Sequence, residues 1–97
     1  MRQVRLLPEA VGDVRAALAW YEQQLPGLAA EFGAALTQII SRIVANPLQF
    51  PRLRDQTHRA IFRRFPYGVY FRLNGNAIIV LAVQHSRRTP RRWQSRR

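Results

Sequence analysis

The sequence predicts an α+β fold in which a two-helix antiparallel hairpin packs on one face of a small antiparallel β-sheet. Three observations lead to this prediction. Apolar residues recur with a helical period of about 3.6 in the first half of the chain and with a strand period of about 2 in the second half. The dipeptide Asn74-Gly75 separates two apolar runs and favours a tight β-hairpin turn. A chain of 97 residues has room for one domain, residues 1–97.

The first half predicts a short N-terminal strand and two helices. The strand occupies residues 1–7, and Pro8 ends it and opens the first helix. The first helix carries an apolar stripe at spacings of 3 or 4 residues: Val11, Val14, Leu18, Tyr21 and Leu25. A second stripe runs from Pro26-Gly27 to Asn46-Pro47: Leu28, Phe32, Leu36, Ile39 and Ile43. Because the break between the stripes is short, we expect an antiparallel helix hairpin.

The second half predicts three strands after an irregular connection at residues 47–58. Residues 59–65 form the first candidate strand, which Pro66 ends. In the second, residues 67–73, apolar side chains alternate with others. The third, residues 76–84, is apolar on both faces, as expected for a central strand that is covered on both sides.

The charge is concentrated in the C-terminal part of the chain. All 16 basic residues are arginine, and the formal net charge is +11. Residues 56–97 hold ten arginines and no acid, which gives this part a charge of +10. The planar guanidinium pairs with phosphate and with carboxylate, so a nucleic acid and an acidic protein segment both remain open as partners. A basic surface that serves only solubility is the alternative.

The composition excludes several classes of site. Without cysteine, disulfides and thiolate chemistry are impossible, and two histidines are too few for an ordinary metal site, so we expect no metal and no cofactor. Glycine-rich phosphate loops and nucleophile elbows are also missing. The longest uninterrupted apolar run has seven residues, 77–83, and the N-terminus does not have the pattern of a signal peptide. We therefore expect a cytoplasmic protein without a membrane-spanning segment.

The polar and aromatic residues of the first helix do not by themselves predict a functional site. Glu9, Asp13 and Glu22 fall outside the apolar stripe, and we expect them to be solvated surface charges. Trp20-Tyr21 could stack a nucleic-acid base, but large aromatic side chains on a helix more often pack in the core.

The arginines of the sheet half are the candidate target-binding residues. An arginine cluster beside a histidine can clamp a phosphate and exchange a proton, which is the minimum needed to cleave RNA without a metal. The candidate catalytic residues for a nuclease are His85, Arg87 and Arg88, although a lone histidine at a strand end is more often structural. The candidate target-binding residues are Arg63, Arg64, Arg72, Arg87, Arg88, Arg91, Arg92 and Trp93.

Segments spread over almost the whole chain resemble the RelE/ParE superfamily of bacterial type II toxins, and the ParE or "plasmid stabilisation" branch most closely. The more specific pair is Arg64-Phe65-Pro66-Tyr67 followed by His85-Ser86-Arg87-Arg88-Thr89-Pro90 and Trp93. The other matching segments are Ala19-Trp20-Tyr21-Glu22, Pro26-Gly27-Leu28, Asn46-Pro47, Phe50-Pro51, Val69-Tyr70-Phe71 and Ala82-Val83-Gln84. The fold of this superfamily is the helix hairpin on a sheet that the periodicity predicts.

The resemblance implies a toxin, and its branches differ in their target. ParE-like members poison DNA gyrase and need no known catalytic residue, whereas RelE-like members cut mRNA on the ribosome. Gly68 stands where RelE-like nucleases carry a strand arginine, and Trp93 stands in place of their terminal tyrosine. Arg87 or Arg88 matches their second arginine. The departures favour a ParE-like gyrase inhibitor and not an enzyme, with a metal-independent, RelE-type mRNA interferase as the alternative.

The resemblance also implies a protein partner. In either branch a small acidic antitoxin, ParD-like or similar, wraps the toxin and neutralises it in a hetero-oligomer. The basic C-terminal part of the chain offers such a partner a complementary surface. A third interpretation is an inactive relative that retains only antitoxin binding.

Overall fold

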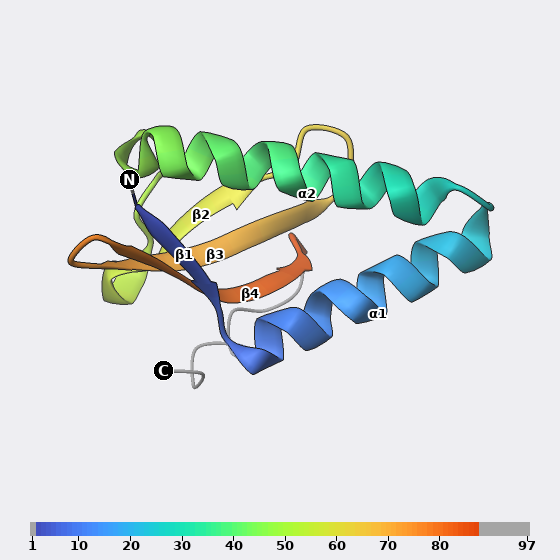
Figure 1. The fold of residues 1–97 in the computed structure, drawn as a ribbon, viewed down its shortest axis with the longest axis horizontal. Coiled ribbons are helices and arrows are strands. Elements are labelled where there is room, and N and C mark those ends of the chain that lie inside the picture. Colours follow the sequence, from blue (N-terminus) through green and yellow to red (C-terminus); the bar gives the residue numbers. More distant parts are fainter. Residues whose placement is uncertain (1, 88–97) are drawn as a thin grey trace.

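The computed structural model describes residues 2–87, and residues 1 and 88–97 lie outside the described part (Figure 1). The described part contains a strand, two helices and three further strands, which confirms the predicted α+β fold. Their bounds are β1 Gln3–Leu6, α1 Pro8–Gln24, α2 Leu28–Ala45, β2 His58–Ile61, β3 Tyr67–Asn74 and β4 Ala77–His85. Two single 3₁₀ turns, Pro47–Gln49 and Arg54–Gln56, lie in the connection between α2 and β2.

The sheet is mixed, which corrects the prediction of an antiparallel sheet. Its strand order is β1-β4-β3-β2. The strands β2, β3 and β4 pair antiparallel, but β1 pairs parallel with β4, with Val4 opposite Ile78. Alternating hydrophobicity specifies the face of each side chain but not the direction of a strand relative to a distant partner. The direction of β1 therefore could not be predicted from its own residues.

Strand β2 is shorter than predicted because the chain turns after Ile61. The backbone N–H of Phe62 donates to the carbonyl of Tyr67 at 2.8 Å, and the N–H of Tyr67 donates to the carbonyl of Phe65 at 2.8 Å. Phe62 and Phe65 are buried, and the ring of each lies 5.1 Å from the ring of Phe32 in α2. Residues 62–66 therefore form a tight turn that is attached to α2 by its aromatic side chains.

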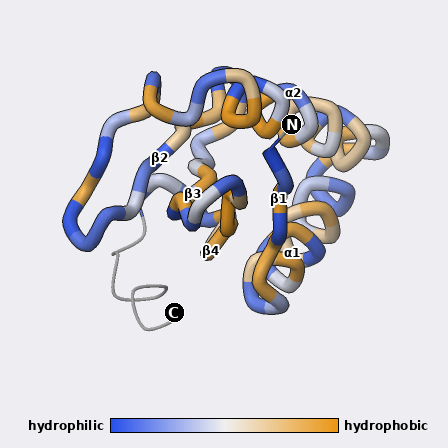
Figure 2. Tube along the Cα trace, turned by 60° about the vertical axis from the view of Figure 1, so that its left-hand side comes forward, coloured by the Kyte–Doolittle hydropathy of each residue, from blue (hydrophilic) through white to orange (hydrophobic). Residues whose placement is uncertain are grey.

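Both helices lie on the same side of the sheet, where the main core forms (Figure 2). The two helices bury Ala10, Ala17 and Tyr21 from α1 and Phe32, Ile39 and Ile43 from α2. The sheet buries Ala60, Val69, Phe71, Ile78, Val80 and Val83 in the same core. The alanines of α1 allow the helix to approach the sheet closely. Strand β4, the most hydrophobic of the strands in Figure 2, lies at the centre of this contact.

The exposure of two residues, Trp20 in α1 and Leu25 directly after it, differs from the prediction. Trp20 is 53% exposed, whereas its neighbour Tyr21 is buried. Consecutive helical residues are about 100° apart around the axis, so only one of the two rings can face the core. Leu25, predicted as the end of the apolar stripe, is 58% exposed, because its extended backbone ends the helix and points its side chain outward.

Helix α2 is long and apolar enough, by length and composition only, to cross a membrane. The helix contains no long uninterrupted apolar run, because polar and charged residues such as Glu31 and Arg42 divide it. Length and composition are weak criteria for a membrane span, since a core helix meets them too. In this fold Phe32, Ile39 and Ile43 of the helix are buried. Five more apolar residues of the helix are partly buried against the same core: Leu28, Ala35, Leu36, Ile40 and Val44.

The sheet also buries apolar side chains on the face away from the helices. Tyr70 pairs with Ala82 and Phe71 pairs with Val80, so Leu81 is an extra residue in β4. Tyr70, Leu81 and Ala82 form a second buried cluster. This cluster confirms that β4 is apolar on both faces, as its sequence predicted.

Candidate functional site

The end of β4 and the turn at residues 62–66 lie side by side and form the candidate site. His85, the last residue of β4, pairs with Tyr67 at the start of β3, and the N–H of Ser86 donates to the carbonyl of Pro66 at 2.8 Å. These contacts bring Arg87 next to the turn that carries Arg63 and Arg64. All three arginines are exposed. The structure thus places three of the predicted target-binding residues on two adjacent segments.

The orientation of His85 limits what its imidazole can do. Its Nδ1 atom accepts the backbone N–H of Arg87 at 3.2 Å, so the proton of the neutral ring is on Nε2. The ring lies against the edge of Tyr67, with centroids 5.6 Å apart. In this arrangement the free nitrogen is a donor, and the lone pair that a general base needs is already engaged. The geometry therefore suits His85 better to holding the strand exit, or to donating a hydrogen bond, than to removing a proton.

Arg64 is held by an acid of α2. Its Nη2 atom lies 2.6 Å from Oε1 of Glu31, and its guanidinium lies over the ring of Phe65, 5.8 Å from the centroid. Both charged side chains are about half exposed or more, so this ion pair contributes at most about 1 kcal/mol. Its main consequence is positional, because it directs the Arg64 guanidinium toward α2. Arg63 has no such acidic partner among the described residues.

Arg72 is separated from the other predicted residues. It lies near the far end of β3, where its Nη2 atom donates to the backbone carbonyl of Asp55. Arg72 lies five positions along β3 from Tyr67, which corresponds to about 17 Å of extended strand. Arg72 also lines a cavity of about 400 Å³ together with Leu7, Leu73 and Leu81. The described part of the chain therefore does not gather all the candidate arginines on one rim.

The remaining predicted residues, Arg88, Arg91, Arg92 and Trp93, lie outside the described residues. Among residues 56–87 there are five arginines and no acid, so the field around the described part of the site is positive.

Gly68 stands where the resemblance to RelE-like nucleases places a strand arginine. It is buried in β3, and a Cβ atom placed on it would lie 3.1 Å from Cδ1 of Ile61 and 3.4 Å from the ring of Tyr70. A side chain at this position would therefore require small movements of Ile61 and Tyr70. Because glycine has no side chain, position 68 supplies no cationic group.

Asp13 is a structural residue of the site that the sequence prediction missed. Its Oδ2 atom accepts the backbone N–H of Val83 at 3.0 Å, and its Oδ1 atom accepts the side-chain amide of Gln84 at 2.9 Å. The residue is part-buried and does not belong to the solvated face of α1. Its spacing from Ala10 and Ala17 was the available signal, because residues three and four positions apart share a helix face.

Glu22 is also structural and not merely a surface charge. Its carboxylate accepts the backbone N–H of Gly27 at 3.1 Å and that of Ala29 at 3.3 Å, at the start of α2. Gly27 has φ +93°, a left-handed conformation in which glycine is favoured. The carboxylate thus satisfies donors that the helix start leaves free, and it fixes the angle of the helix hairpin.

Tyr21 packs against the turn at residues 62–66 and the start of β3. Its ring lies 4.9 Å from that of Phe65 and 5.9 Å from that of Tyr67. Burial, followed by the negative charge that Tyr67 can acquire, raises the pKa of the Tyr21 phenol above its usual value. The ring therefore remains neutral at physiological pH and acts as part of the core.

Residues 2–87 offer no group of three His, Asp or Glu side chains that could hold a metal ion. With His85 engaged through Nδ1 and no cationic side chain at position 68, the described arrangement can bind an anionic partner through exposed guanidinium groups. It does not assemble an acid–base pair around one position.

Comparison with known proteins identifies the family. No curated protein sequence matches the chain. A solved structure described as a chromosomal ParDE toxin–antitoxin system from P. aeruginosa superposes with a TM-score of 0.77 and 18% sequence identity, covering 88% of this chain and 96% of the other. At this identity the likeness shows the fold alone. The family model for the ParE toxin of the type II toxin–antitoxin system parDE matches residues 4–90. The chain therefore belongs to the ParE toxin family.

Proposed function

We propose that this chain is a toxin that inhibits DNA gyrase by binding, acts in the cytoplasm and is neutralised by a cognate antitoxin. The observation that carries the proposal is its match to the ParE toxin family over residues 4–90. The binding surface is formed by Arg63 and Arg64 in the turn, by Arg87 two residues after the end of β4, and by the arginines and Trp93 that follow. Inhibition by binding needs exposed cationic groups but no acid–base pair, which agrees with the arrangement around His85.

The antitoxin partner is supported by charge and by a relative. The chain has a formal net charge of +11, so an acidic partner segment is attracted to it at long range. The solved relative from P. aeruginosa is described as a ParDE toxin–antitoxin system. We infer a hetero-oligomer in which an acidic, ParD-like antitoxin binds this chain and blocks its action on the target.

One observation favours a second function, a metal-independent mRNA interferase of the RelE type. His85 and Arg87 lie two residues apart at the strand exit, and the resemblance places the second arginine of such nucleases at Arg87 or Arg88. The missing arginine at position 68 and the engaged Nδ1 atom of His85 count against this function.

Induction of the protein in a bacterial host separates the two functions. Gyrase inhibition predicts a DNA-damage response and filamentation while mRNA remains intact. Cleavage on the ribosome predicts rapid translation arrest with cut mRNA. Arrest with cut mRNA and no DNA-damage response would contradict the gyrase proposal, and growth without either effect would favour the inactive relative. Co-expression with a short acidic protein encoded beside the gene should restore growth if the antitoxin proposal is correct.

A further inference from the structure

A small cavity lies between helix α2 and the turn at residues 62–66, which joins β2 to β3 beside this helix in Figure 1. Its volume is about 140 Å³, well above the roughly 10–15 Å³ that one water molecule needs. Ile39 and Phe62, which are 4% and 5% exposed, give it an apolar floor. Ala35 borders the same space, and its short side chain leaves room that a larger residue would fill. The cavity can therefore hold a small polar group together with water.

The rim of this cavity is rich in hydrogen-bond donors. Arg42 comes from α2, and Arg63 and Arg64 come from the turn. The side-chain amide of Gln38 lies one helical turn before Arg42, on the same face of α2. Among the described residues that line the cavity there is no acid. An anion can therefore approach donors from both sides of the cavity.

Two of the three guanidinium groups are held in place by their neighbours. The guanidinium of Arg42 lies over the ring of Phe50, 5.2 Å from its centroid, and the residue is partly buried. The guanidinium of Arg64 is bonded to Glu31 of α2 at 2.6 Å. A cationic side chain that is already ordered loses less conformational entropy when it binds an anion.

The charge and the number of donors favour phosphate over carboxylate as the ligand. The guanidinium groups of Arg42 and Arg63 have no hydrogen-bond partner within residues 2–87. With Glu31 counted, three arginines and one carboxylate give this corner a charge of +2. A phosphate group carries up to two negative charges and presents at least two unesterified oxygens in a tetrahedral arrangement, whereas a carboxylate is planar and carries one charge.

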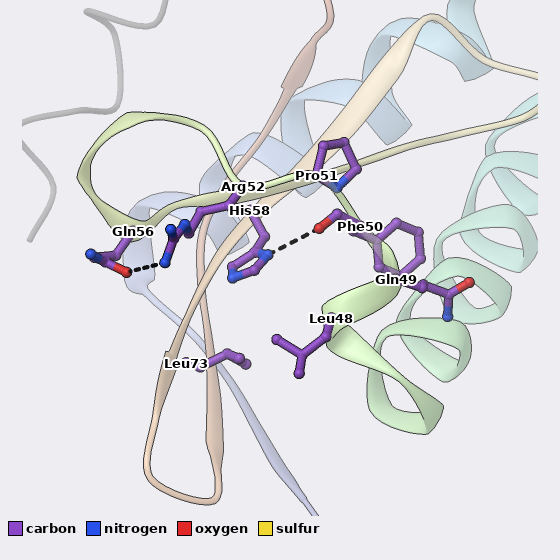
Figure 3. Close-up of a pocket in the computed structure, with 8 residues that line it drawn as sticks. All are labelled: Leu48, Gln49, Phe50, Pro51, Arg52, Gln56, His58 and Leu73. Atoms are coloured by element: carbon purple, nitrogen blue, oxygen red, sulfur yellow. Dashed lines mark hydrogen bonds between the residues drawn. The ribbon is translucent and has the colours of Figure 1, made fainter.

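A larger cavity elsewhere in the molecule lacks this concentration of charge. It has a volume of about 590 Å³ and lies between the α2–β2 connection and the end of β3 (Figure 3). Arg52 is the one arginine among the described residues that line it, and its guanidinium already donates to Gln56 at 3.1 Å. The smaller cavity is therefore the better candidate for an anion site.

We propose that the cavity between α2 and the turn at residues 62–66 binds a phosphate group. The guanidinium groups of Arg42 and Arg63 and the amide of Gln38 donate to its oxygens, and Arg64 adds positive charge at the rim. The inference rests on the proposed function in one respect, since Arg63 and Arg64 also belong to the proposed binding surface. It names phosphate as the group recognised there and adds Arg42 and Gln38 as binding residues.

Titration of the full chain with inorganic phosphate tests the site, observed by NMR at the Nε–Hε signals of Arg42 and Arg63. At constant ionic strength we expect a Kd on the order of 1 mM. Acetate and N-acetylglutamate amide, which present a carboxylate, should bind at least roughly tenfold more weakly. The protein is unchanged in this comparison, so a folding defect cannot explain a difference. Equal binding of phosphate and a carboxylate, or no shift at Arg42 with tens of millimolar phosphate, would overturn the proposal.

Two matched pairs of variants test the location. Ala35→Leu fills the cavity without changing a charge, and Ala34→Leu adds the same side chain at an exposed position of α2. Arg42→Gln removes one guanidinium from the rim, and Arg15→Gln removes an exposed one from α1.

The first variant of each pair should weaken phosphate binding roughly three- to tenfold, and the second should leave it unchanged. Thermal unfolding of each variant checks that the fold is retained, and the comparison of anions needs no variant. Unchanged phosphate binding by folded Ala35→Leu and Arg42→Gln would overturn the proposal.

A second probe, a 12-base-pair DNA duplex without terminal phosphates, distinguishes the sources of the phosphate. Shifts at Arg42 with both probes support a backbone phosphate as the ligand, and shifts with inorganic phosphate alone support a free phosphate ion. Gyrase inhibition is measured separately. Inhibition without phosphate binding would overturn this inference alone, whereas phosphate binding without inhibition would support it and contradict the proposed function.

Discussion

The carboxylate of Asp13 in α1 accepts the backbone N–H of Val83 in β4, 70 residues later in the chain, at 3.0 Å. Strand β1 pairs with β4 only as far as Val80, whose carbonyl accepts the N–H of Leu7. Beyond Val80 no strand of residues 2–87 borders this edge of β4, and a side chain from a helix provides the acceptor for Val83 instead. The contact fixes the last residues of β4 immediately before His85 and the exposed arginines of the candidate site.

Replacing Asp13 by alanine should destabilise the protein and loosen the end of β4. The substitution leaves the N–H of Val83 and the amide of Gln84 without their acceptor, which costs about 1–3 kcal/mol of unfolding free energy. Urea unfolding measures this loss, and hydrogen exchange should accelerate at the Val83 amide. Glu9→Ala on the exposed side of the same helix is the control, with a change of about 0.5 kcal/mol or less. Equal losses for both variants would contradict the proposed role of Asp13.

Stability should fall in alkali because of Tyr21. Burial raises the pKa of its phenol in the folded state above the unfolded value of about 10. The stability that this shift contributes is therefore fully present below about pH 10 and is lost as the pH rises through the folded-state pKa. Thermal unfolding followed from pH 9 to about pH 11.5 should show this decline. In Tyr21→Phe the decline should be shallower, and an unchanged pH profile would contradict the assignment to Tyr21.

Gly68→Ala should be tolerated, with a loss of about 1 kcal/mol or less. The new Cβ atom would meet Cδ1 of Ile61 at 3.1 Å, but this atom is the end of a side chain that is 42% exposed and can move. Gly68→Arg tests function at the same position. If binding and not cleavage is the mechanism, the arginine should create no ribosome-dependent RNA cutting, and His85→Ala should remove none. RNA cleavage by the unchanged protein or by Gly68→Arg would favour the interferase alternative if the cleavage is lost when His85→Ala is added.

Removing the exposed arginines of the strand exit should separate toxicity from stability. Arg87→Ala combined with Arg88→Ala should melt within a few degrees of the unchanged protein, because Arg87 is exposed and substitutions of exposed residues usually change stability little. Growth inhibition should nevertheless be lost, while antitoxin binding persists. Ile43 is only 1% exposed, so Ile43→Ala should instead cost about 2–5 kcal/mol of unfolding free energy. Full toxicity of the double variant would move the binding surface elsewhere, first to the exposed Trp20 on α1.

The sequence was sufficient to predict the elements of the fold but not all of their relations. Periodicity located both helices and the hairpin at Asn74-Gly75, since burial on one face requires a regular spacing of apolar residues. It could not give the parallel direction of β1, because that direction depends on which edge of the sheet is free. Strand β2 ended early because the buried Phe62 and Phe65 pack on α2, a long-range contact that local alternation does not reveal.

The candidate site was predicted only in part, for a similar reason. Charge counting and the family resemblance found Arg87 and the turn with Arg63 and Arg64, and the structure brings those segments together. Asp13 was assigned to solvent because a carboxylate on a helix usually is solvated, and its partner is a backbone amide 70 residues away. Nothing in the alternation of β4 indicates that its edge is uncovered at Val83. That information exists only in the assembled sheet.

The most direct test of the central claim is a supercoiling assay with purified DNA gyrase and relaxed plasmid. The account predicts that the purified protein inhibits supercoiling in a dose-dependent way. The variant with Arg87→Ala and Arg88→Ala should inhibit at least roughly tenfold less, a loss of about 1.4 kcal/mol of binding free energy. Arg15→Ala, which removes an exposed arginine from α1, should inhibit like the unchanged protein. Undiminished supercoiling at every toxin concentration, together with mRNA cleavage on purified ribosomes, would contradict the account.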